Sequence, residues 1–202
     1  MGVARAAMNP FRQNAFPAVA TLLLGASLYF TVRVSALKRS VETTPGVSVP
    51  SGAEVTLTAV LDGDEVSVRY GASHVHVRLL GVYAFDPTTN DPVEQPFGRA
   101  AVSYLETLRE QPVTLEFDEA KVDSQKRLLA YLRKDGADLG EGMVQRGLAL
   151  AYTKYAFLRS SAYVLAEEQA IRGTAGLWAD GRVVERAKRL RSLWEQERRG
   201  LE

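Results

Sequence analysis

The chain of 202 residues has room for one domain of ordinary size and an additional segment. It carries 25 basic and 24 acidic side chains, no cysteine and only two histidines. This composition excludes disulfides, thiol catalysis and metal sites built from cysteine or from several histidines.

The charges are distributed unevenly along the chain. The first 41 residues hold five basic side chains and no acidic one, whereas residues 51–179 hold 13 basic and 18 acidic side chains. Broad, non-specific binding of nucleic acid depends on a positive surface that displaces counterions. The acidic balance of residues 51–179 therefore argues against avid DNA binding, and it leaves open a small substrate or a single strand held only at one site.

An uncharged run near the N-terminus predicts a membrane span. Residues 15–32 carry no charge, and Arg12 and Arg33 flank them. A helix of this length rises about 27 Å, close to the thickness of the hydrocarbon layer. We expect a basic segment at 1–14, one transmembrane helix at 15–36, and a linker at 37–53 that is rich in Ser, Thr, Pro and Gly.

Two other readings of this N-terminal segment stay open. Val34-Ser35-Ala36 satisfies the small-residue rule for signal-peptide cleavage, which would make the protein secreted. An acid-free start with arginines also fits a mitochondrial address. We expect an uncleaved anchor and a single-pass membrane protein, because the apolar run is long for a signal and Arg33 directly precedes the cleavage site. The flanking positive charges do not decide which side of the membrane the domain faces.

Residues 54–180 have the pattern of a small barrel with helices. The first alternating run ends at Asp62-Gly63-Asp64, which is a hairpin turn signal. The expected strands cover 55–60, 66–70, 74–82, 113–117 and 128–132. The expected helices cover 97–109, 139–146 and 161–172. Five strands with a helix between the third and the fourth are typical of an OB-type Greek-key β-barrel, so the predicted class is α+β with about three packed helices.

A charged helix is expected after the barrel, within residues 181–202. Val184, Ala187, Leu190 and Trp194 would form one stripe along residues 183–199. We expect this helix to pack on its own domain, and a protein partner for it is the alternative.

Five short motifs follow one another along the domain. They are Leu61-Asp62-Gly63-Asp64-Glu65-Val66, Val77-Arg78-Leu79-Leu80-Gly81-Val82, the run at 123–131, Gln145-Arg146-Gly147-Leu148-Ala149, and Gly176-Leu177-Trp178. A carboxylate on a tight turn can hold a hard cation, and two arginine forks can grip a phosphodiester. In this order the motifs resemble the staphylococcal-nuclease-like (thermonuclease) family, over residues 54–179.

The resemblance implies a calcium-dependent nuclease site. In this family the position of Asp64 supplies a calcium ligand, the positions of Arg78 and Arg127 contact the scissile phosphate, and the position of Asp86 holds the general base. Taken alone, Asp62-Gly63-Asp64 fits a simple turn better than a metal site, and only together with the two arginines does it favour the site. The arginines could also form structural ion pairs.

This chain departs from the family at the catalytic centre. Tyr83 stands where the family has a second metal carboxylate, so we expect Ca²⁺ to bind weakly. Asp86 is one methylene shorter than the usual Glu, which predicts slower proton transfer. Glu94 is a conceivable substitute base if its loop folds back.

Further departures and polar groups lie near these site residues in the sequence. Lys126 replaces a glycine, and Gln125 replaces a frequent aromatic residue. His74 and His76 share a strand face with Arg78, and a polar sheet face explains them better than a metal site. Tyr152 and Tyr155 lie where relatives line a nucleotide pocket, and they can equally be ordinary core or surface tyrosines.

We therefore predict a membrane-tethered, thermonuclease-like phosphodiesterase with weakened activity. It would act on single-stranded DNA or RNA, with Arg78, Asp86 and Arg127 as catalytic residues and Asp64 as the metal ligand. The alternative is a catalytically inactive OB module that binds a protein or single-stranded nucleic acid near a membrane.

Overall fold

The computed structural model describes residues 47–119, 122, 123, 125 and 127–200. The predicted basic segment, the predicted span at 15–36 and most of the predicted linker lie outside the described residues. Within the described part of the chain, no helix is long and apolar enough to cross a membrane.

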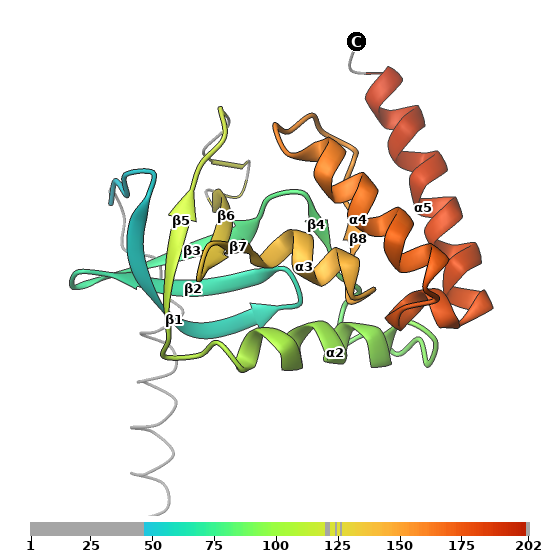
Figure 1. The fold of residues 1–202 in the computed structure, drawn as a ribbon, viewed down its shortest axis with the longest axis horizontal. Coiled ribbons are helices and arrows are strands. Elements are labelled where there is room, and N and C mark those ends of the chain that lie inside the picture. Colours follow the sequence, from blue (N-terminus) through green and yellow to red (C-terminus); the bar gives the residue numbers. More distant parts are fainter. Residues whose placement is uncertain (1–46, 120–121, 124, 126, 201–202) are drawn as a thin grey trace, which may run out of the picture. The chain divides into compact units, whose positions relative to one another are not determined.

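Five strands close into a barrel, as predicted from the sequence (Figure 1). The strands are β1 (Ala53–Asp62), β2 (Glu65–Tyr70), β3 (Ser73–Leu79), β5 (Pro112–Glu116) and β6 (Leu128–Lys134). Neighbouring strands pair antiparallel in the order β3-β2-β1-β5-β6. A parallel pairing between β3 and β6, from Val77 opposite Leu128 to Leu79 opposite Ala130, closes the ring. Closure covers the sheet edges of β3 and β6 where these two strands pair.

Helices and three very short strands lie around the barrel. The helices are α2 (Gln95–Glu106), α3 (Leu139–Gln145), α4 (Ser160–Arg172), the 3₁₀ helix η1 (Gly176–Ala179) and α5 (Gly181–Arg199). The short strands are β4 (Val82–Tyr83), β7 (Ala137–Asp138) and β8 (Leu150–Ala151). β4 pairs with β8 away from the barrel sheet, and β7 extends β6.

Several element boundaries differ from the prediction, most of all those of β3 and α2. The third strand was expected to run to residue 82, but β3 ends at Leu79 and the chain turns at Gly81, where φ is 77°. The helix expected at 97–109 begins at Gln95, because Pro96 suits the first turn of a helix. It ends at Glu106, and the chain then turns through Glu110, where φ is 59°.

The hydrophobic core has two parts. One part fills the barrel and extends to α2, α3 and α4. The other joins β4 and β8 to the C-terminal helices and contains Phe85, Leu150, Leu177, Trp178 and Trp194. Helix α5 therefore packs on its own domain, as expected, through a buried stripe of Val183, Ala187, Leu190 and Trp194.

Two glycines explain why the last two sequence motifs contain glycine. Gly147 and Gly176 both have positive φ, 64° and 53°, and their backbones cross closely. A Cβ on Gly147 would lie 2.0 Å from the carbonyl oxygen of Ala175, and a Cβ on Gly176 would lie 2.3 Å from that of Gly147. The Leu177 N–H donates to the Gly147 carbonyl at 2.9 Å. This crossing joins the end of α3 to the start of the C-terminal helices.

We expect Gly147→Ala to lower the free energy of unfolding by about 3 kcal/mol, because it adds both backbone strain and a steric clash. Gly136→Ala is the matched control, since Gly136 also has positive φ (81°) but a Cβ there would meet nothing within 4 Å. The control should lose only about 1 kcal/mol. Urea unfolding followed by circular dichroism measures both variants, and equal losses would show that the crossing is unimportant.

Candidate functional site

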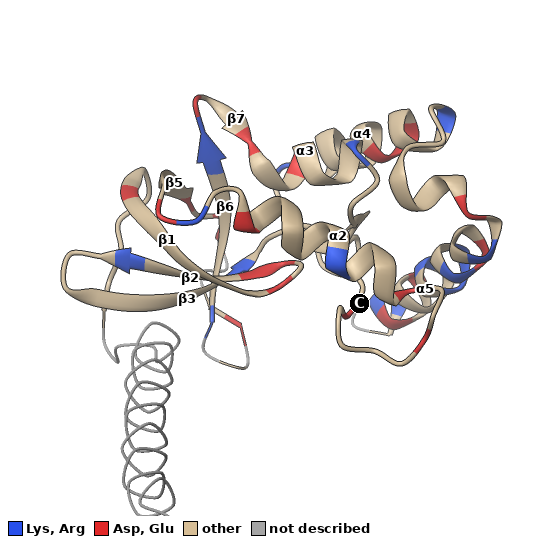
Figure 2. Cartoon of the chain, turned by 90° about the horizontal axis from the view of Figure 1, so that it is seen from below, with Lys and Arg blue, Asp and Glu red and all other residues tan. Residues whose placement is uncertain are grey.

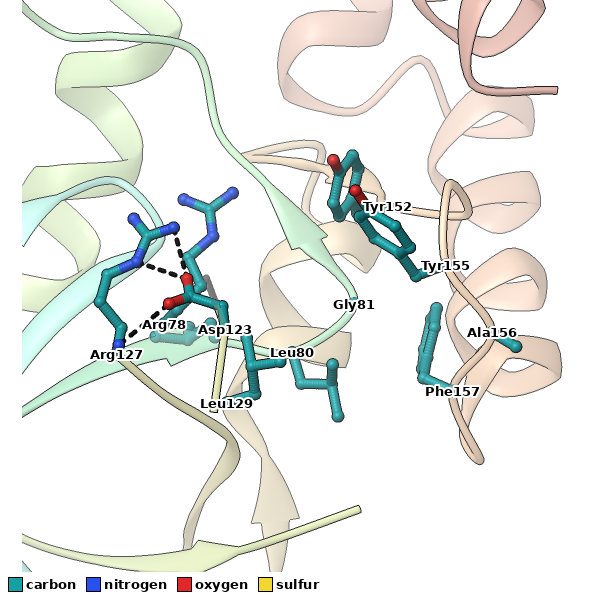
Figure 3. Close-up of a pocket in the computed structure, with 11 residues that line it drawn as sticks. Arg78, Leu80, Gly81, Asp123, Arg127, Leu129, Tyr152, Tyr155, Ala156 and Phe157 are labelled. Carbon is teal, nitrogen blue, oxygen red and sulfur yellow. Dashed lines mark hydrogen bonds and ion pairs between the residues drawn. The ribbon is translucent and has the colours of Figure 1, made fainter. Parts of the chain in front are cut away.

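A pocket of about 480 Å³ lies beside the parallel pair of β3 and β6 (Figure 3). Arg78 comes from β3, and Arg127 directly precedes β6. The register places Arg78 opposite Leu129, so the parallel pairing brings the two arginines to the same end of the barrel. The pocket is lined by Arg78, Leu79, Leu80, Gly81, Asp123, Arg127, Leu129, Tyr152, Tyr155, Ala156 and Phe157. The two predicted phosphate-binding arginines thus line one cavity.

Carboxylates hold both arginines in place. Arg78 forms an ion pair with Asp64, and Arg127 pairs with Asp123, with 2.7 Å from Nε to Oδ2 (Figure 3). Glu65 joins the two arginines, because its Oε1 accepts a hydrogen bond from Arg127 and lies 3.5 Å from Nη1 of Arg78. The arginine side chains keep 17% and 22% of their surface exposed, so both remain accessible from the pocket.

Asp64 is buried behind Arg78 and does not line the pocket. Its side chain is 2% exposed, and its second oxygen accepts the Ala84 N–H at 2.8 Å. Burial raises the pKa of Asp64 to about 7, although Arg78 and the Ala84 N–H both act to lower it. In this arrangement Asp64 orients an arginine and fixes the backbone after β4.

Tyr83 belongs to an aromatic cluster that three separate elements build. Its ring stacks on Tyr152 at a centroid distance of 6.0 Å and meets Trp194 of α5 edge-on at 5.2 Å. Phe85 lies 6.1 Å away, also edge-on. Burial raises the pKa of the Tyr83 phenol, which therefore stays neutral at physiological pH. A neutral ring packed in this way stands at the position for which the resemblance implies a carboxylate.

The two candidate general bases are both engaged elsewhere. Asp86 is exposed, and it accepts the Thr88 N–H at 2.7 Å and the Thr88 hydroxyl at 2.6 Å, which lower its pKa. It does not line the pocket. Glu94, which precedes α2, pairs with Nε of Arg186 at 2.6 Å. Its loop therefore faces α5, and Glu94 is not free to act as a base in this conformation.

Tyr152 and Tyr155 both line the pocket, as the resemblance implies. Their rings meet edge-on at 6.0 Å, and Tyr155 is 54% exposed. Exposed aromatic rings beside two arginines offer faces on which nucleobases can stack. His74 and His76 lie on the same strand as Arg78 and do not line this cavity.

The side chains present do not fit a calcium ion. Calcium takes six to eight oxygen ligands, several of them carboxylate. Among the described residues, no group of three or more His, Asp or Glu side chains could hold a metal. Both oxygens of Asp64 are already bonded, and Tyr83 points into an aromatic cluster. We therefore derive the chemistry of this pocket from its arginines and tyrosines.

Two features of the site escaped the sequence analysis. Glu65 lies opposite Arg78 in the β2–β3 ladder, a pairing that counting back from the turn at Gly71 could have predicted. Trp194 contacts Tyr83 from a helix far along the chain, and no local pattern predicts such a contact.

Comparison with known proteins is consistent with this geometry. Residues 76–180 match the family described as "Staphylococcal nuclease homologue", which is more than half of the chain. The chain belongs to the staphylococcal nuclease homologue family. Helix α5 lies beyond the matched residues.

Individual relatives support the same family membership. Endonuclease YncB of Bacillus subtilis is 30% identical over 131 residues, which cover 62% of this chain and 61% of YncB. The SPbeta prophage-derived endonuclease YokF of the same organism is 34% identical over 110 residues, covering 50% of this chain and 37% of YokF. The thermonuclease of Staphylococcus intermedius is 30% identical over 101 residues, covering 50% of this chain and 60% of that protein. The chain thus matches less than two thirds of the length of each relative.

Proposed function

We propose that this member of the staphylococcal nuclease homologue family hydrolyses phosphodiester bonds of single-stranded nucleic acid, with weakened activity, while residues 15–36 hold it at a membrane. The observation that supports this activity is the pocket shared by Arg78, Arg127, Tyr152 and Tyr155. Its relatives named endonuclease and thermonuclease support the same reaction class.

Each lining group has a role in the proposed reaction. The forks of Arg78 and Arg127 bind the phosphate oxygens and stabilise the negative charge that grows as water attacks phosphorus. Tyr152 and Tyr155 stack on neighbouring bases. Before a phosphate can bind, each arginine has to give up a carboxylate partner. Substrate binding is therefore weaker than it would be at two arginines without such partners.

The weakness of the proposed activity follows from the candidate base and metal ligand. Asp86 would have to leave Thr88 and reach the attacking water within about 3 Å. A misplaced group of this kind can cost on the order of a hundredfold in rate. Calcium, which the family resemblance implies, would have Asp64 as its one carboxylate ligand, and only after Asp64 releases a present partner.

The second candidate function is a catalytically inactive module that binds a protein or a single strand near the membrane. The packing of Tyr83 against Trp194 favours it, because a ring fills the place of a catalytic carboxylate. The two functions are separated by cleavage of fluorescent single-stranded DNA and RNA by the full chain in detergent, with calcium or with chelator. The nuclease is supported if Arg127→Ala abolishes cleavage and Arg172→Ala leaves cleavage unchanged. Arg172 is a suitable control because it is distant from the pocket and 65% exposed. Intact substrate at high protein concentration supports the inactive module.

We expect Glu65→Gln to tighten the binding of a nucleoside bisphosphate about tenfold, because the phosphate no longer competes with a carboxylate between two arginines. Calorimetric titration in chelator measures this affinity without turnover. Glu54→Gln, at an exposed position on β1, is the control and should change nothing. Weaker binding by the Glu65→Gln variant would mean that Glu65 holds the arginines in their binding geometry instead of competing with the ligand.

A further inference from the structure

Helix α5 carries a basic surface on an otherwise acidic domain (Figure 2). Its 19 residues contain seven basic and three acidic side chains, whereas residues 51–179 have an acidic excess. The buried stripe of α5 faces the domain, so most of these charges lie on its exposed sides. The excess of positive charge is thus concentrated on one helix beyond the residues that match the family.

Three arginines of α5 line a second cavity of about 440 Å³. Arg182, Arg186 and Arg189 face the loop before α2, which contributes Asp91 and Glu94. Residues four and three apart share one side of a helix, and a rise of 1.5 Å per residue separates the first and last arginines by about 10 Å along the axis. This arginine row (Arg182, Arg186 and Arg189) therefore forms one wall of the hollow.

The carboxylates nearby occupy part of the donors of these arginines. Arg182 pairs with Asp180 at 2.7 Å, and Asp91 also acts on it electrostatically. Glu94 takes the Nε of Arg186 at 2.6 Å, and the arginine fork has further N–H donors. Arg189 is exposed, and Glu185 acts on it electrostatically. With Asp180 and Glu185 counted beside the lining Asp91 and Glu94, the row has no excess of positive charge. What it offers a phosphate is the set of N–H donors that remain on Arg186 and Arg189.

Helix α5, which carries the arginine row, also reaches the candidate active site. Tyr152, which lines the first pocket, meets Trp194 of α5 edge-on at 4.9 Å. Trp194, on the same helix as the row, packs against the Tyr83 ring at 5.2 Å. A strand held at Arg78 can therefore continue past Tyr83 toward the arginine row.

We propose that the arginine row is an accessory phosphate-binding site, which holds the sugar-phosphate backbone of a single strand beside the pocket of Arg78 and Arg127. The identity of the ligand rests on the proposed function. Arginine forks match phosphate oxygens, and three of them along about 10 Å of helix can meet more than one phosphate of a strand. A flexible strand enters a hollow, whereas an anionic membrane surface meets flat or convex faces, so nucleic acid is the favoured ligand.

The test measures binding of a fluorescent single-stranded oligonucleotide to the full chain in chelator, by anisotropy over a series of salt concentrations. The double variant Arg182→Gln, Arg189→Gln spares Arg186, which Glu94 needs as a partner. Each lost phosphate contact lowers the slope of log K against log salt by about 0.7, so we expect the double variant to lower it by about 1.4. The control Arg69→Gln, Arg172→Gln removes equal charge from exposed arginines that line neither cavity.

An unchanged slope in the Arg182, Arg189 variant, with its melting temperature preserved, overturns the proposal. A second outcome also overturns the proposal: the variant binds the oligonucleotide normally but no longer binds detergent micelles doped with phosphatidylserine. In that case the arginine row is a membrane contact. A reduced slope supports the row even if the chain cuts no substrate, and in that case only the proposed hydrolysis fails. Cleavage with an unchanged slope supports the hydrolysis alone.

Discussion

We expect Arg78→Ala to lower kcat/KM for single-stranded substrate by about a hundredfold to a thousandfold. The substitution removes a preorganised donor to the charge that develops on the phosphate, and losses of this size accompany the removal of one such donor. Initial rates of cleavage of a fluorescent oligonucleotide, measured over a range of substrate concentrations, check the prediction.

Arg78 also has a structural role, and a second variant separates the two effects. Alanine leaves Asp64 buried without its cation, so the free energy of unfolding should fall by about 3 kcal/mol at neutral pH. This loss should shrink as the pH falls, because burial raises the pKa of Asp64 and a protonated carboxyl needs no cation beside it.

Arg78→Lys restores a positive partner for Asp64 but not the planar fork. It should recover most of the stability and little of the activity. Full activity in the lysine variant would contradict a role for bidentate phosphate binding.

Tyr83→Asp should make the site more like that of the family, and at the same time destabilise the fold. A second carboxylate beside Asp64 should give cleavage a response to calcium that the present side chains do not support, since calcium affinity follows the charge of its ligands. Loss of the ring from its contacts with Tyr152 and Trp194 should cost about 3 kcal/mol. Calcium titrations of the cleavage rate and urea unfolding measure the two effects.

The control for this substitution is Tyr83→Asn, which removes the same ring and adds no charge. It should lose the same stability without any gain in calcium response. If the Asp and Asn variants respond to calcium alike, then the tyrosine does not stand in place of a metal ligand, and the weakness of the site has another cause.

The barrel was predictable because its strands alternate and its turns contain glycine. Strands β1 and β2 flank the turn at Asp62-Gly63-Asp64, and the ladder closes as the five-strand pattern requires. The pairing of β4 with β8 was not predictable, because ladders of two residues have no readable period. The same pairing carries Tyr83 to Tyr152, so the aromatic cluster could not be foreseen either.

The sequence predicted the arginines of the candidate site better than it predicted the partners of the carboxylates around it. Arg78 lies in an apolar stretch, Arg127 directly precedes one, and the family resemblance places both at the same site. The partners of Asp86 were readable in principle, since an Asp two residues before a Thr often bonds to the backbone of its own turn. The pairing of Glu94 with Arg186 was not predictable, because these residues are far apart in the sequence and only the packing of α5 brings them together.

Calorimetric titration of the full chain with a nucleoside bisphosphate decides whether Arg78 and Arg127 together bind a phosphate in one pocket. We predict measurable binding in chelator that Arg78→Lys and Arg127→Lys each weaken by at least about tenfold, while Arg172→Lys leaves it unchanged. Binding that is absent from the wild type, or equal in all four proteins, would contradict the phosphate pocket and the hydrolysis that depends on it.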